Sequence, residues 1–486
     1  MSKPRKSNIA VLLTCAGFLL FPRFTLAQYI EAAIKLDPEK RSASVEGKFI
    51  SGERRSLSFL LSAIGAPDLG QRISNVRLSD RTGSTVGSRR TSSAEFAADS
   101  AIAKFRYDVD IKPVSDARSA AHASWLDGEL GLLMLDDLLP IPGSPNEQRA
   151  ALKIELPTGW HLYGGSPSGR GFYEFENVGR AAIFVGKSVR FHRNNGKELI
   201  GLAVAGTWSF PDAEAAGMAA EIYREYRSLF GVDTTKDRLV VLLPFPQANV
   251  PKGTWEAETR GSTVIIASAE MPFKSQSLQR LHEQLRHEVF HLWLPNGVNL
   301  TGRYDWFYEG LALYQSLKTG VALNRIRFDD MLDTLSRAHN IDSAQARKLS
   351  LIDASATRWA GQETQVYARG MIIAFLCDLI LLRDSTGKRS AEDLFRKLFA
   401  DHRPPAVPVE GNQAILRILD SYPALGPVVR AYVRGNERFD WTAELAAAGI
   451  VNEAPSGLQV ASKLTGKQKT LLDKLGYNNW RKLTQK

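Results

Sequence analysis

The spacing of hydrophobic residues changes near residue 200, and this change limits the folds open to the chain. Between residues 28 and 200, short segments of alternating hydrophobic and polar residues are separated by Gly, Ser, Asp and Pro, as in 103–111 (AKFRYDVDI). Such segments are typical of half-buried strands. Beyond residue 201, hydrophobic residues recur at spacings of three and four, which indicates amphipathic helices. We therefore expect an α+β protein, with a β-sandwich-like domain at 28–200 and a mixed, increasingly helical domain at 201–450.

Within the second domain, the sequence predicts two apolar strands and six helices. The strands are expected at 238–243 (RLVVLL) and 263–267 (TVIIA). The helices are expected at 213–230, 277–294, 306–318, 364–383, 390–400 and 412–422. Residues 451–486 are polar and rich in Lys, and we expect them to form a short C-terminal tail.

The composition is that of a globular protein with more than one domain. Of the 486 residues, 44% are hydrophobic and 23% are charged. A mean hydropathy of −0.19 excludes a multi-span membrane protein. The chain has only two cysteines, Cys15 and Cys377, and the first lies in a segment that we expect to be removed. No intramolecular disulfide is therefore expected, and stability must come from packing.

The first 27 residues have the three parts of a secretory signal peptide. Basic residues precede an apolar run at 9–21, and small residues follow, ending at Ala27. The run is shorter than the roughly 20 residues that a membrane span needs. We therefore expect export to the periplasm or the cell exterior, with no stable membrane span after cleavage. The segment holds four basic and no acidic residues, so its loss lowers the net charge from +10 to +6. The remaining charge is scattered, and no nucleic-acid partner is expected.

A pair of histidines marks the helix expected at 277–294. Its core-facing residues are Leu278, Leu281, Leu285, Val289 and Leu292. His287 and His291 lie off this stripe and on one face of the helix, four residues apart. With Glu288 between them they form HEVFH, a pattern in which two histidines bind zinc and the glutamate acts on the metal-bound water. Two surface histidines on an amphipathic helix are the competing interpretation.

A third ligand is needed for a catalytic zinc site, and Glu309 is the candidate. A catalytic zinc takes three protein ligands and keeps one position open. Glu309 lies in an aromatic and apolar stretch (WFYEGLALY), where burial of an unpaired carboxylate is costly. A metal bond removes that cost, and pairing with an arginine is the alternative.

The segment HEVFHLWLPNGVNLTGRYDWFYEGLALY resembles the metal site of gluzincin metallopeptidases, in which an HExxH helix is followed by a glutamate ligand in a W-x-x-E-G context. Tyr367-Ala368-Arg369-Gly370 is similar to the Tyr-x-Lys-Gly motif of the zinc aminopeptidases and the glycyl aminopeptidase family. The next stretch, MIIAFLCDLILLRDSTGKRS, resembles the glycyl aminopeptidases more specifically. The resemblance extends from about residue 237 to 450.

This resemblance implies a secreted zinc peptidase, with one Zn²⁺ per chain and peptides as substrates. It implies a thermolysin-like catalytic domain, in which Glu288 acts as general base and Tyr367 stabilises the oxyanion. Gly253 and Glu256 resemble the segment that binds the free amine of the substrate, although Thr254 and Ala257 depart from the family pattern. The strand at 263–267 is then expected to bind the peptide backbone as an edge strand. Small N-terminal residues are the expected specificity, and the short tail leaves no room for the PDZ domain that relatives often carry.

Three other residues have simpler interpretations, and two other functions stay open. We expect His282 to be solvated or hydrogen-bonded, Asp305 to orient a ligand histidine or cap a helix, and Cys377 to pack in the core. An endopeptidase could use the same zinc site if Glu256 points away from the metal. A catalytically silent protein that binds peptides or envelope partners is the other alternative. The sequence does not predict the oligomeric state.

Overall fold

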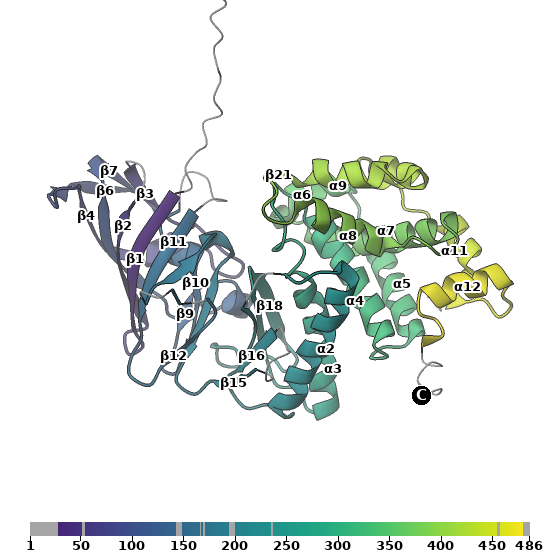
Figure 1. Cartoon of the computed structure of the whole chain (residues 1–486), viewed down its shortest axis with the longest axis horizontal. Helices are drawn as coiled ribbons and strands as arrows, with labels where there is room; N and C mark the ends of the chain where they lie inside the picture. Colours follow the sequence, from purple (N-terminus) through teal and green to yellow (C-terminus); the bar gives the residue numbers. More distant parts are fainter. Residues whose placement is uncertain are drawn as a thin grey trace, which may run out of the picture.

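The computed structural model describes residues 28–479, apart from 51–53, 142–147, 166, 169–170, 194–199, 235–236 and 454–456. The expected signal peptide therefore lies outside the described residues. The sheets form one side of the molecule and the helices form the other (Figure 1). This arrangement confirms the predicted α+β class, with strands first and helices later in the chain.

The N-terminal part contains three sheets that share one hydrophobic core. The largest sheet has the order β13-β11-β1-β2-β8-β4-β5, and only β1 and β11 pair in parallel within it. Its strands are β1 (Gln28–Asp37), β2 (Ser42–Phe49), β4 (Ile73–Ser79), β5 (Thr85–Val86), β8 (Lys104–Asp110), β11 (Gln148–Glu155) and β13 (Tyr173–Phe175). A three-stranded sheet is formed by β3 (Arg54–Ser58), β7 (Glu95–Ile102) and β6 (Ser88–Ser92). A four-stranded sheet is formed by β12 (His161–Tyr163), β14 (Ala182–Gly186), β10 (Leu130–Met134) and β9 (Trp125–Leu126).

These sheets pack face to face, as the alternating pattern predicts. Val45 and Tyr107 of the large sheet, Leu57 of the small sheet and Leu133 and Ile183 of the four-stranded sheet are fully buried in one cluster. The other face of the four-stranded sheet packs on the sheet of the second domain. The N-terminal domain therefore lies directly against the mixed domain that follows it.

The second domain begins with a five-stranded sheet of order β15-β16-β17-β19-β18. The strands are β15 (Arg190–His192), β16 (Ile200–Val204), β17 (Arg238–Leu243), β18 (Trp255–Arg260) and β19 (Thr263–Ser268). The two expected strands, β17 and β19, are confirmed, and both are buried in parallel pairing. β18 contains Glu256 of the segment that resembles an amine-binding motif, and it pairs antiparallel with β19.

The position of β18 corrects the expected edge strand. β19 lies between β17 and β18, so the strand at 263–267 has no free edge for a peptide. β18 is the edge strand instead. Its alternating order Trp-Glu-Ala-Glu-Thr-Arg is too polar to stand out as a strand by hydropathy, and pairing with the apolar β19 fixes its conformation.

The helices build the rest of the molecule around a long apolar helix. They are α2 (Asp212–Phe230), α3 (Lys274–Phe290), α4 (Leu311–Ala322), α5 (Phe328–Ala344), α6 (Leu351–Ala356), α7 (Glu363–Asp384), α8 (Ala391–His402), α9 (Gly411–Asp420) and α11 (Thr442–Ala448), with short α1 (Leu135–Leu138) and α10 (Gly426–Val428). All six expected helices exist, although the one expected at 306–318 starts as a π-helical turn at Trp306–Gly310. α5 and α6 were not among the expected helices.

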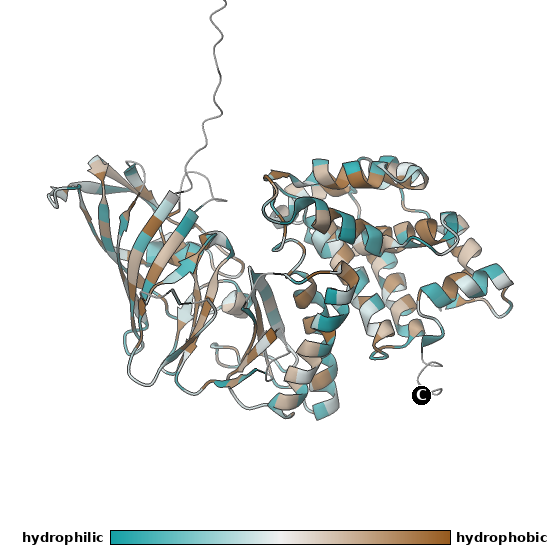
Figure 2. Cartoon of the chain, in the orientation of Figure 1, coloured by the Kyte–Doolittle hydropathy of each residue, from teal (hydrophilic) through white to brown (hydrophobic). Residues whose placement is uncertain are grey.

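Helix α7 is the centre of the helical part. Among the described residues it is the one helix long and apolar enough to cross a membrane, but 94% of its most apolar stretch is buried inside the protein. Hydrophilic residues lie on the outer helices that surround it (Figure 2). The chain then forms the β22 (Ile450–Glu453) and β23 (Gly457–Val460) hairpin and α12 (Gly466–Lys474), where Leu458 and Leu472 join the main core. Short strands β20 (Leu300–Thr301) and β21 (Val409–Glu410) pair in parallel.

Candidate metal centre

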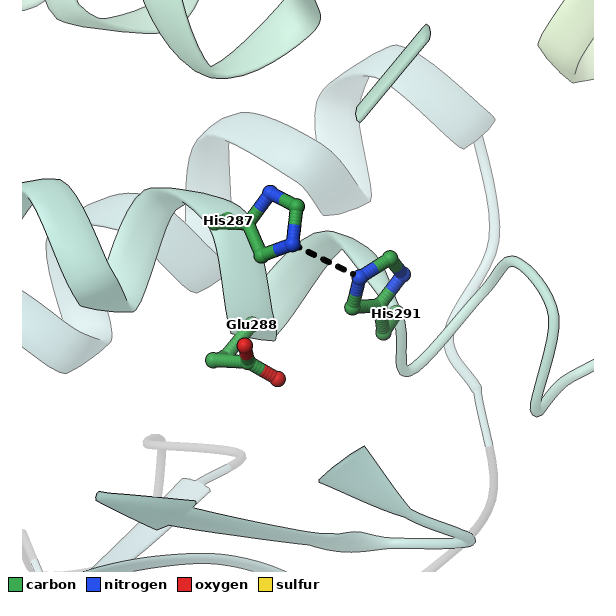
Figure 3. Close-up of side chains that lie close together, drawn as sticks. All are labelled: His287, Glu288 and His291. Atoms are coloured by element: carbon green, nitrogen blue, oxygen red, sulfur yellow. Dashed lines mark hydrogen bonds between the residues drawn. The ribbon is translucent and has the colours of Figure 1, made fainter. Parts of the chain in front are cut away.

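Three of the predicted side chains meet at one point at the end of α3. The Nε2 atoms of His287 and His291 are 3.1 Å apart, and the planes of their rings are nearly perpendicular, at 86° (Figure 3). Oε2 of Glu309, from the π-helical turn before α4, lies 3.3 Å from Nε2 of His287 and 3.6 Å from Nε2 of His291. The structure therefore brings the two histidines and the predicted third ligand together.

The three atoms have the spacing and the available lone pairs that a zinc ion requires. Ligand atoms about 2.0–2.1 Å from a tetrahedral ion are about 3.3 Å from each other. Nδ1 of His291 bonds to the backbone oxygen of Leu294 at 2.8 Å, which leaves Nε2 as the metal-facing lone pair. Oε2 of Glu309 is buried and has no hydrogen-bond partner among the described residues. A cation between these atoms would satisfy all three.

The electrostatics of the three residues favour positive charge at the same point. Burial alone would raise the pKa of Glu309, but the two imidazoles hold it well below its usual range. Burial would lower the pKa of His291, but the Glu309 carboxylate raises it to about 9. A divalent cation would replace the proton that this arrangement attracts.

Glu288 lies on the side of the two imidazoles that faces the sheet (Figure 3), and one of its carboxylate oxygens is within 4.8 Å of a ring nitrogen of each histidine. The hydroxyl of Thr259 in β18 donates to Oε2 of Glu288 at 2.7 Å, which fixes the carboxylate between α3 and the edge strand. Burial raises the pKa of Glu288 despite the nearby histidines. The raised pKa makes Glu288 a stronger base than an exposed carboxylate, which favours a role in proton transfer.

Arg358 joins the metal-facing residues to Tyr367, and sequence reasoning missed it. Its Nη1 donates to Oδ1 of Asp305 at 2.9 Å and to Oε1 of Glu309 at 3.0 Å. Its Nη2 donates to the phenol oxygen of Tyr367 at 2.5 Å. Because Tyr367 accepts this bond, its own hydrogen stays available for another acceptor. Burial and Glu309 raise the pKa of Tyr367 well above its usual range, so it remains a donor.

Two carboxylates of β18 lie beside a histidine from the N-terminal domain. Nδ1 of His122 is 3.0 Å from Oε2 of Glu258, and its Nε2 is 3.5 Å from Oε2 of Glu256. Nε of Arg260 lies 3.1 Å from Oε1 of Glu258. Burial would raise the pKa of Glu258, but Arg260 and His122 lower it to about 2. Glu258 is therefore an anion, and it was not expected from the sequence.

A single cavity of about 1040 Å³ connects these groups. It is lined by residues of β18, of α3, of the turn before α4 and of α7, among them Glu256, Glu258, His287, Glu288, His291, Glu309, Arg358 and Tyr367. His122, from the N-terminal domain, forms part of its wall. Gly253 precedes β18 with a φ of 80°, a conformation that favours glycine, and it does not line the cavity.

The structure also places the three residues for which the sequence indicated simpler interpretations. Cys377 is buried in α7, as predicted. His282 is buried rather than solvated, with 2% exposure, because it accepts a hydrogen bond from Arg286. Asp305 neither caps a helix nor contacts an imidazole, because its carboxylate pairs with Arg358.

Comparisons with known proteins identify the fold. No family model matches the sequence, and no curated protein matches it. Solved structures do match. An aminopeptidase N family protein from Idiomarina loihiensis superposes with a TM-score of 0.72 and 15% identity, over 90% of this chain and 82% of that one. An M1 zinc metallopeptidase from Deinococcus radiodurans, as a mutant bound to Tyr-Ser-Ala, gives a TM-score of 0.57 and 14% identity over 85% and 95% of the two chains. Without the mutation, that enzyme gives 0.54 and 15% over 85% and 94%.

The chain therefore has the fold of the M1 zinc metallopeptidases. This agrees with the gluzincin resemblance of the sequence, whereas the narrower likeness to glycyl aminopeptidases has no counterpart in these neighbours.

Proposed function

We propose that this chain is an exported zinc-dependent aminopeptidase that removes small N-terminal residues from peptides. The observation that carries the proposal is the meeting of three metal-binding atoms, a buried carboxylate and a tyrosine hydroxyl in one cavity beside a free edge strand. The fold supports the same conclusion. Export is proposed from the signal-like residues 1–27, and the periplasm or cell exterior is the proposed location.

Each group of residues in the cavity would have a separate role in peptide hydrolysis. His287, His291 and Glu309 would hold Zn²⁺, which, when bound, supplies a Lewis acid for the scissile carbonyl and lowers the pKa of water. Glu288 would accept the proton of the attacking water and pass it to the leaving amine. Tyr367 would donate its free hydrogen to the oxyanion.

Arg358 keeps two of these groups in place. It neutralises the outer oxygen of Glu309 and holds the phenol of Tyr367 from behind, so that both face the cavity. The planar guanidinium bonds two acids and a phenol at once. Lysine would fill this role poorly, because its ammonium group lacks that planar fork of donors.

The free amine of the substrate is assigned to Glu258 rather than to Glu256. The charge of Glu258 acts on the pKa of Glu288, and that of Glu309 acts on Glu258, so its carboxylate lies within electrostatic range of the reacting groups. Oε2 of Glu256 lies 3.5 Å from Nε2 of His122. An ammonium group bound at Glu258 would place the first peptide bond next to Glu288.

The preference for a small first residue rests on the sequence resemblance alone. The side chain of Trp255, at the start of β18, forms part of the cavity wall and is consistent with a shallow pocket. A panel of aminoacyl substrates graded by side-chain volume tests this point.

Free and acetylated peptides of identical sequence test the proposal. Acetylation removes the ammonium charge, and a charge-assisted hydrogen bond to it is roughly twice as strong as a neutral one. We expect cleavage of the free peptide alone, and a loss of at least about 10-fold in kcat/KM for Glu258→Gln. Glu256→Gln is the matched control. A larger loss of kcat/KM in Glu256→Gln than in Glu258→Gln would show that Glu256 binds the amine. Internal cleavage of the acetylated peptide would indicate an endopeptidase.

A further inference from the structure

Arg286 is a buried cation whose charge the mechanism above does not use. It precedes His287 in α3 and is 3% exposed. Its Nη1 donates to Nδ1 of His282 at 2.7 Å, and its Nε donates to Oγ of Ser316 at 3.4 Å. Both acceptors are neutral groups. Among the residues that the structure describes, no carboxylate lies within 4.0 Å of the guanidinium.

Among the described residues, no neighbouring acid forms an ion pair with Arg286, although Glu283 acts on its charge from a distance. His282 accepts from Arg286 on Nδ1, so its proton is on Nε2, 3.7 Å from Oε2 of Glu221. Burial and the charge of Arg286 lower the pKa of His282 to about 3, and the imidazole stays neutral. Glu221 is bonded to Arg325 at 2.8 Å. Glu283, three residues before Arg286 on the helix, is 56% exposed and faces Arg280 at 3.5 Å.

An uncompensated buried guanidinium is costly, which indicates an anionic partner from outside the chain. A buried charge is normally paired or hydrogen-bonded to a group of opposite charge. Arg286 has a planar fork of donors suited to a carboxylate, and only part of that fork is used by His282 and Ser316.

Arg286 is also placed where a substrate would reach it. It forms part of the wall of the metal-site cavity and part of the wall of a second cavity of about 620 Å³, and Glu283, Leu317 and Thr334 likewise line both. The two cavities therefore adjoin along α3. The second cavity continues away from His287 toward the start of that helix.

The edge strand gives the direction of the peptide. Ser268 of β19 pairs with Trp255 of β18, and α3 begins at Lys274 after a short loop, so the first half of α3 lies near the start of β18. A peptide that binds antiparallel to β18, with its amine at Glu258, runs toward this same end. Its leaving-group side then runs toward the second cavity, whose wall includes Arg286.

We infer that Arg286 binds a carboxylate on the leaving-group side of the substrate. The inference rests on the proposed aminopeptidase function and deepens it, because it names a substrate class. The carboxylate is either the C-terminus of a short peptide or an acidic side chain just after the cleaved bond. Asp330 and Asp333 line the second cavity beyond Arg286, together with Arg325 and Arg337. Because Arg286 adjoins His287 in α3, peptides of two or three residues are the first substrates to test.

Matched peptide pairs test the inference and separate the two sources of the carboxylate. Ala-Ala-Ala is compared with its C-terminal amide, and Ala-Glu-amide is compared with Ala-Gln-amide. We expect wild-type kcat/KM to be about 10-fold to 100-fold higher for the acid in one of these pairs. Preference in the first pair assigns the C-terminus, and preference in the second assigns the side chain. Equal rates within both pairs overturn the inference.

Substitutions then locate the preference. In Arg286→Met, the ratio of kcat/KM for the acid to that for the amide should fall close to one. Arg286→Lys should keep part of this preference for the acid, because the charge remains. Arg280→Met, on the same helix but outside both cavities, should leave the ratio unchanged. A full preference in Arg286→Met overturns the assignment.

A binding measurement tests the role of Arg286 independently of the proposed aminopeptidase activity. Calorimetric titration of Glu288→Gln with each peptide needs no hydrolysis. Tighter binding of the acid by about 10-fold or more supports the inference even if the wild-type protein cleaves nothing, which would refute the aminopeptidase proposal alone. Equal binding of acid and amide in both pairs overturns the inference.

Discussion

Replacing His122 with glutamine should remove about 3 kcal/mol of the pH dependence of the protein's stability between pH 6 and 9.5. His122 is buried between the N-terminal domain and β18, with 7% exposure. Burial would lower its pKa, but the hydrogen bonds that its ring donates to Glu256 and Glu258 raise the pKa from 6.5 to about 9. The imidazolium therefore links the two domains through two carboxylates.

The size and sign of this effect follow from the shift. One pKa unit corresponds to about 1.4 kcal/mol, so the rise is worth about 3 kcal/mol of folding free energy. Because the folded pKa is the higher one, this stability is fully present below pH 6.5. It is lost as the pH rises from 6.5 through 9, where the folded protein also releases the proton. Glutamine is uncharged throughout and cannot contribute such a dependence.

Urea unfolding of wild type and His122→Gln at pH 6.0 and pH 9.5 measures the effect. The difference in unfolding free energy between the two proteins should shrink by about 3 kcal/mol at the higher pH. His161→Gln is the matched control, because His161 is an exposed histidine of the same domain. A difference in unfolding free energy between wild type and His122→Gln that is the same at both pH values would refute the reasoning.

Three further substitutions test the roles of the cavity residues. Glu288→Gln should keep the metal but lower kcat by at least about 100-fold, because the amide cannot accept the proton of water; a rate near wild type would exclude Glu288 as the base. Tyr367→Phe should lower kcat by about 100-fold to 1000-fold with little change in KM, and an unchanged kcat would remove the oxyanion role. Arg358→Lys should weaken zinc binding by about 10-fold to 100-fold, measured by competition with a chelator, whereas wild-type affinity would show that the guanidinium bridge does not support Glu309.

The parts of the site that local sequence predicts are those in which one helix fixes the geometry. His287 and His291 share a face because they are four residues apart on α3, and the distance between their Nε2 atoms follows from that spacing. Glu309 was recognisable because its apolar surroundings make an unpaired carboxylate improbable. The α+β class followed from periodicity alone, for the same local reason.

The parts that escaped prediction depend on contacts between distant segments. Arg358 gives no local signal, since its partners Asp305 and Glu309 lie about fifty residues earlier. Glu258 was missed because β18 is polar and becomes a buried edge strand only when His122 and Arg260 neutralise its carboxylates. The pair of His282 and Arg286 did have a signal, because residues four apart on a helix are neighbours.

The metal content of the ligand variants tests the central claim most directly. Elemental analysis of the purified protein should give one zinc per chain, and His287→Ala, His291→Ala and Glu309→Ala should each lose tight binding. Removal of zinc with a chelator should abolish hydrolysis of free-amine peptides, and addition of one equivalent should restore it. Stoichiometric zinc in all three variants, or full hydrolysis by protein without metal, would contradict the account.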